Sequence, residues 1–177
     1  MALDYAHGQG VIRRDIKPDN IMPLEDGRVN VTDFGIAPVV DSSKTHTGAV
    51  LGTPNYMPAE QVVDQTLDGR SDLFSLGIVF YELLAGAKPF KGDTISAIIH
   101  AITHNAHPPL SGAQQEIPVC CQAIVDRLLL KGQNNRFDSA ARLSEAIETY
   151  AVELPRSTAE PIVDAGQPED PEPEFAD

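Results

Sequence analysis

Two short polar motifs joined by a strand-turn-strand stretch constrain this chain more than any other feature. The first motif, at residues 13–20, reads Arg-Arg-Asp-Ile-Lys-Pro-Asp-Asn, and the second, at residues 33–35, reads Asp-Phe-Gly. They contain Asp15, Asn20 and Asp33, side chains that can handle metal ions and protons, at a spacing that few sequences reproduce. A lone Asp-Phe-Gly arises by chance in turn-rich loops, but two ordered motifs in one stretch argue against coincidence.

This arrangement resembles the catalytic centre of protein kinases, whose signature is H-R-D-L-x-x-x-N followed by D-F-G. The resemblance implies that Asp15 accepts the substrate hydroxyl's proton and that Lys17 binds ATP by offsetting charge on the transferred phosphate. It also implies that Asn20 and Asp33 hold Mg²⁺, for which carboxylate and amide oxygens are the expected ligands. Lys17 followed by Pro18 is typical of the serine/threonine branch. ATP and Mg²⁺ are therefore the expected cofactors, and a protein substrate the expected partner.

Kinases also have a Gly-rich loop, a strand Lys and a helix Glu, all upstream of the catalytic loop. In this sequence that loop comes about a dozen residues after Met1, no G-x-G-x-x-G occurs, and the first lysine is Lys17. We therefore expect residues 1–150 to form the C-terminal lobe of a kinase-like fold with the N-lobe absent. The expected fold is mainly α, with a small β-hairpin and a long activation loop.

Apolar patterning predicts the main helices of this fold. Residues 72–84 are apolar around nearly the whole helical circumference, so we expect a helix buried on all sides that ends at Gly86 and Pro89. An amphipathic segment follows at about residues 119–131, with Ile124, Leu128 and Leu129 as its apolar stripe. Another begins at an N-cap, Asp138 or Ser139, and is expected to bury four residues at helical spacing: Leu143, Ala146, Ile147 and Tyr150.

The segments around the two motifs are predicted from turn signals. Residues 2–6 are typical of the last turns of a helix that stops near Gly8 and Gly10. Residues 21–32 predict a β-hairpin around Glu25-Asp26-Gly27. Residues 36–56 are small and polar with little periodicity, which is typical of a long mobile loop.

The resemblance to kinases continues through most of the chain. Residues 52–60, Gly-Thr-Pro-Asn-Tyr-Met-Pro-Ala-Glu, look like the peptide-binding segment, whose Thr, here Thr53, contacts the catalytic Asp and Lys. Asp72 matches an acid that braces the catalytic-loop backbone from the buried helix. Arg136 stands where the family has an Arg that pairs with the position of Glu60, and we expect a buried ion pair there.

The sequence departs from the family pattern in three places. Arg13 replaces a His that packs behind the Phe of Asp-Phe-Gly, and a buried guanidinium there would cost several kcal/mol unless it is paired or turned to water. Pro58-Ala59 inverts the usual Ala-Pro order before Glu60, and Pro38 stands where relatives tend to have a basic residue. These are marks of relaxed catalytic constraint. They leave two alternatives to an active kinase fragment: an inactive, pseudokinase-like interaction module, or a truncated remnant.

The resemblance also predicts a regulatory site. Arg14 precedes the catalytic Asp, and kinases of this kind use such an Arg to receive a phosphate from the loop after Asp-Phe-Gly. Thr45 and Thr47 lie in the middle of that loop and are the expected phosphorylation sites. The alternative is that both are ordinary loop hydroxyls.

Charge and composition limit the remaining classes of function. The net charge is −13, and residues 151–177 contain eight acids, one base and five prolines, so we expect an acidic, Pro-rich disordered tail. The alternative is that this tail binds a partner. The chain shows no basic patch for nucleic acid. No apolar run is long enough for a membrane segment. The adjacent Cys120 and Cys121 are poorly placed to pair with each other, which favours a reducing, cytoplasmic location.

Three histidines, His100, His104 and His107, raise the question of a metal site. His100 and His104 would share one helix face. No Glu follows His100 as in H-E-x-x-H, and two prolines follow His107. We therefore interpret them as part of a solvated helix face.

Overall fold

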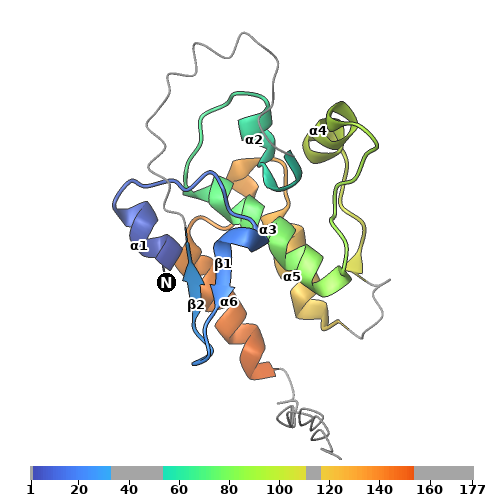
Figure 1. Cartoon of the computed structure of the whole chain (residues 1–177). Coiled ribbons are helices and arrows are strands. Elements are labelled where there is room, and N and C mark those ends of the chain that lie inside the picture. Colours follow the sequence, from blue (N-terminus) through green and yellow to red (C-terminus); the bar gives the residue numbers. More distant parts are fainter. Residues whose placement is uncertain (1, 33–53, 111–116, 154–177) are drawn as a thin grey trace, which may run out of the picture.

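Helix α3, Gly69–Ala85, runs through the middle of the helices and is the element around which the others pack (Figure 1). The computed structural model describes residues 2–32, 54–110 and 117–153. The helix begins at an Asp68 N-cap, whose carboxylate accepts a hydrogen bond from the backbone N–H of Arg70. It ends at Gly86, whose φ of 67° is the left-handed conformation that glycine adopts without strain. The predicted stop at Gly86 is confirmed.

The burial of α3 changes along its length. Leu73, Phe74 and Ile78 are fully buried, whereas Leu83 is 74% exposed. The prediction of a helix buried on all sides is therefore wrong for its last turns. Apolar residues surround the helix in sequence, but at its C-terminal end only the face that includes Leu84 packs against the core.

Two helices pack on α3 from the C-terminal part of the chain. Helix α5, Val119–Leu128, crosses it at Gly77, where an added Cβ would come within 2.7 Å of the Leu128 Cβ. Helix α6, Ala140–Glu153, packs against α3, α5 and the first helix, α1, Ala2–Gly8. These contacts bury one apolar cluster: Leu73, Ile124, Leu128, Phe137, Ala140 and Leu143.

The start of α6 decides between the two predicted N-caps. The Ser139 hydroxyl accepts a hydrogen bond from the backbone N–H of Arg142, as an N-cap does. Along the helix Leu143 is buried and Tyr150 partly buried, but Ile147 is 41% exposed. Its predicted burial is wrong, because the packed stripe of α6 is narrower than its apolar stripe.

A second cluster lies on the other flank of α3. It involves the short helix α2, Ala59–Val62, the 3₁₀ turn η3, Pro54–Tyr56, and helix α4, Ile95–His104, which Thr94 caps. Its buried side chains include Phe74, Ile78, Phe90 and Ile102. Residues 54–56 were expected to continue a loop and instead form an ordered turn. The rest of the predicted loop, up to residue 53, lies outside the described residues.

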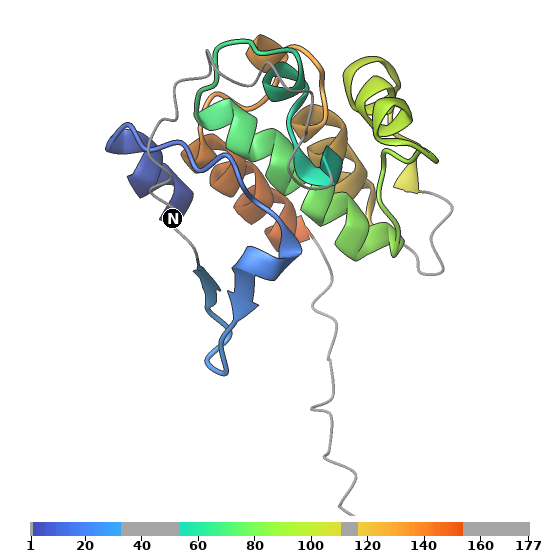
Figure 2. The same cartoon turned by 45° about the horizontal axis from the view of Figure 1, so that its top comes forward.

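The predicted hairpin is confirmed. Strands β1, Ile21–Pro23, and β2, Val29–Val31, pair antiparallel with Ile21 opposite Val31. Gly27, with φ of 78°, supplies the turn conformation that other residues rarely adopt. The hairpin projects from the helices (Figure 2), and it follows directly from the 3₁₀ turn η1, Pro18–Asn20.

None of the helices in the described ranges has the length and apolar character that crossing a membrane requires. Cys120 and Cys121 are both free and partly buried in α5. Burial raises the pKa of the Cys121 thiol, which makes it less reactive.

Candidate active site

The loop between α1 and β1 brings three of the predicted site residues together. Lys17 Nζ lies 2.9 Å from Asp15 Oδ2, and Asn20 Nδ2 donates to the Asp15 backbone oxygen at 3.0 Å and to Asp15 Oδ2 at 3.1 Å. The Asp15 side chain is 62% exposed, while Asn20 is buried. A carboxylate is thus held by two donors and still faces solvent. A group placed this way can accept a proton from a bound hydroxyl.

The local sequence explains the conformation of this loop. Ile16 directly follows the exposed Arg14 and Asp15, is buried at 2% exposure and anchors the loop. Pro18 then starts the turn η1, where its missing N–H is not needed. At the far end the Thr32 N–H donates to the Asn20 carbonyl at 2.9 Å, which ties the end of the hairpin back to the loop.

The Asp72 carboxylate of α3 binds the backbone of the loop between α1 and β1. Its Oδ2 accepts from the Arg13 N–H at 2.9 Å and its Oδ1 from the Arg14 N–H at 3.0 Å. His7 Nε2 of α1 contacts the same Oδ2 at 2.8 Å. Asp72 is 1% exposed, so its charge is balanced by hydrogen bonds rather than by water. The contact to the loop is the one that the family resemblance implied.

Arg14 adopts φ of 61°, in the left-handed region that non-glycine residues rarely occupy. Two consecutive N–H groups, those of Arg13 and Arg14, point at one carboxylate as a result. Strained backbone of this kind persists where surrounding contacts over-determine it, and it is concentrated at functional sites. Asp15 is the residue that directly follows this left-handed position.

Arg13, the residue that departs from the family His, is half-buried. Its Nη1 lies 3.5 Å from the Val31 carbonyl of β2, so the guanidinium extends along the hairpin. This contact supplies an acceptor for part of the charge whose burial the sequence made costly.

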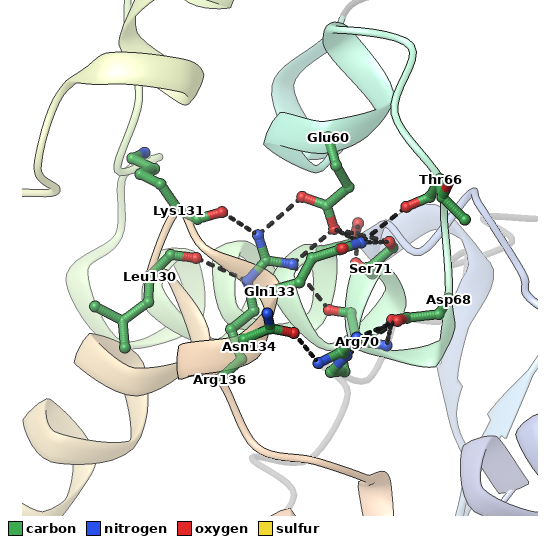
Figure 3. A network of polar contacts seen from close by, with 11 residues as sticks. Glu60, Thr66, Asp68, Arg70, Ser71, Leu130, Lys131, Gln133, Asn134 and Arg136 are labelled. Atoms are coloured by element: carbon green, nitrogen blue, oxygen red, sulfur yellow. Dashed lines mark hydrogen bonds and ion pairs between the residues drawn. The ribbon is translucent and has the colours of Figure 1, made fainter.

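A second polar network surrounds the Glu60 carboxylate (Figure 3). Arg136 Nη1 and Nη2 lie 2.7 and 2.8 Å from Glu60 Oε1 and Oε2, a bidentate pair between two side chains at most 2% exposed. Burial raises the pKa of the Glu60 carboxyl, but hydrogen bonds from Arg136, the backbone and Ser71 outweigh it and the pKa is lowered. The other guanidinium N–H groups donate to backbone carbonyls of Leu130, Lys131 and Arg70. The expected buried ion pair is present.

The inverted Pro58-Ala59 sequence is accommodated just before Glu60. Pro58 is the N-cap of α2, with φ of −70°, and its carbonyl accepts from the Gln61 N–H at 3.0 Å. Ala59 then occupies the first helical position and is buried. The proline constraint moves by one residue, and Glu60 keeps its place opposite Arg136.

Sequence reasoning missed two contacts. The Tyr56 hydroxyl donates to Glu82 Oε2 at 2.6 Å, which fixes the segment before α2 to the end of α3. Burial, and then the hydrogen bond to the Glu82 carboxylate and its negative charge, raise the pKa of the Tyr56 hydroxyl. The contact of His7 with Asp72 was also missed. No local pattern signals it, because the two residues are 65 positions apart.

Other predicted residues do not belong to these two polar networks. Asp33, Thr53, Thr45 and Thr47, together with Pro38, lie outside the described residues. His100 and His104 stack with ring centroids 4.6 Å apart, and no group of three or more His, Cys, Asp or Glu in the described part of the chain could hold a metal. His107 does not belong to the solvated face expected for it. Its side chain is 12% exposed and pairs with Asp126 at 3.2 Å.

Comparison with known proteins agrees with this geometry. Residues 1–147 match the protein kinase domain family, and the chain belongs to that family. It is 42% identical over 152 residues to the probable serine/threonine-protein kinase PknB of Bifidobacterium longum, covering 84% of this chain and 22% of that protein. Serine/threonine-protein kinase PknB of Mycolicibacterium smegmatis is 39% identical over 145 residues, covering 80% of this chain and 23% of that protein. Serine/threonine-protein kinase Pkn1 of Myxococcus xanthus is 36% identical over 164 residues, covering 89% of this chain and 24% of that protein. The chain thus spans under a quarter of the length of these relatives.

Proposed function

We propose that residues 1–150 are the C-terminal lobe of a serine/threonine protein kinase catalytic domain, and that residues 151–177 are a tail. With an N-terminal lobe, this lobe transfers the γ-phosphoryl group of ATP to Ser or Thr hydroxyls of a protein. The observation that carries the proposal is the cluster of Asp15, Lys17 and Asn20, held at the surface by the buried Asp72. The names of the relatives, all serine/threonine-protein kinases, support the same class of acceptor.

Each side chain of the cluster has a role that fits its position. The exposed Asp15 carboxylate orients the substrate hydroxyl and accepts its proton. Lys17, 2.9 Å from it, places a positive charge where the phosphoryl group passes. The Asn20 amide nitrogen faces Asp15, and its amide oxygen, together with the Asp33 carboxylate, would hold Mg²⁺. ATP with Mg²⁺ supplies the phosphoryl group and neutralises its charge when bound. Such an activity belongs in the cytoplasm, where ATP is available.

The segment that ends at Glu60 would hold the substrate peptide. Glu60 and Arg136 fix its C-terminal end, and Tyr56 and Glu82 fix it earlier. Thr53, which precedes η3, would contact Asp15 and Lys17. These anchors connect the peptide-binding surface to α3, the helix that also supports the catalytic loop through Asp72.

The loop after Asp33 would carry the regulatory phosphate. Arg14 is exposed and precedes Asp15, so it can receive a phosphothreonine at Thr45 or Thr47 through paired hydrogen bonds. Phosphosite mapping by mass spectrometry after incubation with ATP tests this role. An unmodified loop, or an unchanged rate after replacing both threonines with Ala, would remove it.

The test of the main proposal uses the chain preceded by a kinase N-terminal lobe. The Asp15→Asn and Asp33→Asn variants should each lose transfer of radiolabelled phosphate to a protein substrate, while their thermal unfolding stays cooperative. Asp126→Asn, an exposed acid on α5, is the matched control and should keep the parent rate. Near-parent rates in the Asp15 variant would contradict the proposed chemistry. Absence of nucleotide binding by calorimetry would instead favour the interaction module.

A further inference from the structure

A pocket of about 370 Å³ lies at the C-terminal end of α3 and serves none of the contacts described so far. Its lining includes three prolines and a leucine, Pro89, Pro108, Pro109 and Leu110, together with Lys88 and Lys91. The volume lies within the range of pockets that hold ligands. Apolar walls with two ammonium groups suit a ligand that has both carboxylates and apolar or proline residues.

The two pocket lysines differ from the other lysines of the described chain. Lys17 pairs with Asp15, and Lys131 is half-buried and donates to the Ile102 carbonyl. The Nζ atom of Lys88 lies 4.9 Å from the centre of the Tyr56 ring. In the described ranges, neither Lys88 nor the exposed Lys91 forms an ion pair with a carboxylate. In a chain of net charge −13, two such lysines beside one pocket are a local excess of positive charge.

We propose that this pocket binds residues 164–175 of the same chain. This segment, Asp-Ala-Gly-Gln-Pro-Glu-Asp-Pro-Glu-Pro-Glu-Phe, contains five acids, three prolines and Phe175, and no base. Its carboxylates complement Lys88 and Lys91, and its prolines and Phe175 complement the apolar walls. The function proposed above is not needed for this inference.

The connection to α6 favours this occupant over a separate acidic protein. A free partner with the same charge is repelled by the net charge of −13, whereas a tethered segment is held near the pocket at an effective concentration on the order of millimolar. Helix α6 ends at Glu153, so ten residues, 154–163, form the connection. Ten residues can span up to roughly 33–36 Å, about the width of a small domain.

The experiment follows the backbone amide shifts of the non-proline residues among 164–175 in the ¹⁵N-labelled chain of 177 residues. In the parent chain these shifts should move when sodium chloride is raised from low concentration to about 0.5 M, because exposed charge pairs are screened. The Lys88→Ser/Lys91→Ser double variant should lose most of that response, and Lys91→Ser alone should lose part of it. Arg142→Ser, which removes one exposed charge on α6, should keep it.

Three outcomes would overturn the proposal. A tail whose shifts are the same in the parent and in the double variant does not use the lysines. A salt response that disappears on tenfold dilution shows that the segment binds a second copy. An unchanged response in Phe175→Ser overturns the apolar part of the recognition. Unaltered amide shifts in α3 and α6 of each variant confirm that the fold is intact.

Discussion

Arg136 and Glu60, 76 positions apart, form a bidentate ion pair with N···O distances of 2.7 and 2.8 Å, and neither side chain is more than 2% exposed. The pair joins α2 to the segment between α5 and α6. The guanidinium carbon also lies 4.5 Å from the centre of the Phe74 ring, so the pair is enclosed by the apolar core. Removal of either partner leaves a buried charge without its counterion.

We expect Arg136→Ala to lower the free energy of unfolding by about 3–5 kcal/mol, because Glu60 is then buried and unpaired. Urea denaturation of the two chains measures this difference. The control is Arg142→Ala, which breaks an ion pair with Glu145 that is more than 60% exposed on both sides and should leave the midpoint unchanged. Equal midpoints for Arg136→Ala and the parent would show that the pair does not stabilise the fold.

Asp72→Ala should release the catalytic loop. The N–H groups of Arg13 and Arg14 lose a charged acceptor, and each such hydrogen bond contributes about 1.5–3 kcal/mol. Hydrogen exchange at these two amides should become faster than in the parent. Ser75→Ala removes another buried polar group of α3, whose hydroxyl donates to the Ser71 carbonyl of the same helix, and should leave both amides protected. Retained protection in Asp72→Ala would mean that other contacts hold the loop.

The lowered pKa of Lys131 predicts that the stability of the fold depends on pH in the alkaline range. Burial, and then repulsion by Arg136, lowers the pKa of this lysine to about 8 from 10.5. Between these values the unfolded chain binds more protons than the folded chain, so the free energy of unfolding rises with pH from about 8 to 10.5. Lys131→Met keeps the stem and removes the titration. The parent should therefore gain stability relative to this variant as pH increases, and parallel urea midpoints across the range would contradict the assignment.

Gly77→Ala should destabilise the crossing of α3 and α5. The added methyl would lie 2.7 Å from the Leu128 Cβ and 3.0 Å from a methyl of Leu129, so one helix has to move. Overpacking of this kind costs about 1–3 kcal/mol, which thermal unfolding detects. Gly8→Ala, at a helical position where an added methyl meets nothing within 4 Å, should have no such effect. A Gly77→Ala chain that melts like the parent would show that the crossing adapts freely.

Residue order in the motifs allowed much of the site to be predicted. The grouping of Asp15, Lys17 and Asn20, the brace from Asp72 and the pairing of Glu60 with Arg136 followed from the register of matched segments. The hairpin and the end of α3 followed from turn and cap residues whose backbone requirements are local. The proposed roles of these side chains in catalysis are still to be tested.

Other features depend on which elements meet in space, and apolar spacing does not encode that. Leu83 and Ile147 continue apolar stripes but face solvent, because no described element covers them. The contact of Tyr56 with Glu82 joins segments that are separate in sequence, and nothing in either segment specifies its partner. His107 was assigned to a solvated helix face, but it lies beyond the end of α4 and packs edge-on against Tyr81.

The attachment of the Arg13–Arg14 backbone to Asp72 affects how the proposed site would bind its ligands. Ordering one residue's backbone costs roughly 1–2 kcal/mol in conformational entropy, and here that cost is met when the chain folds. A peptide or nucleotide that arrives later finds the Asp15 carboxylate already placed. None of its binding free energy is spent on ordering the Arg13–Arg14 backbone, so this part of the entropic cost of binding is absent.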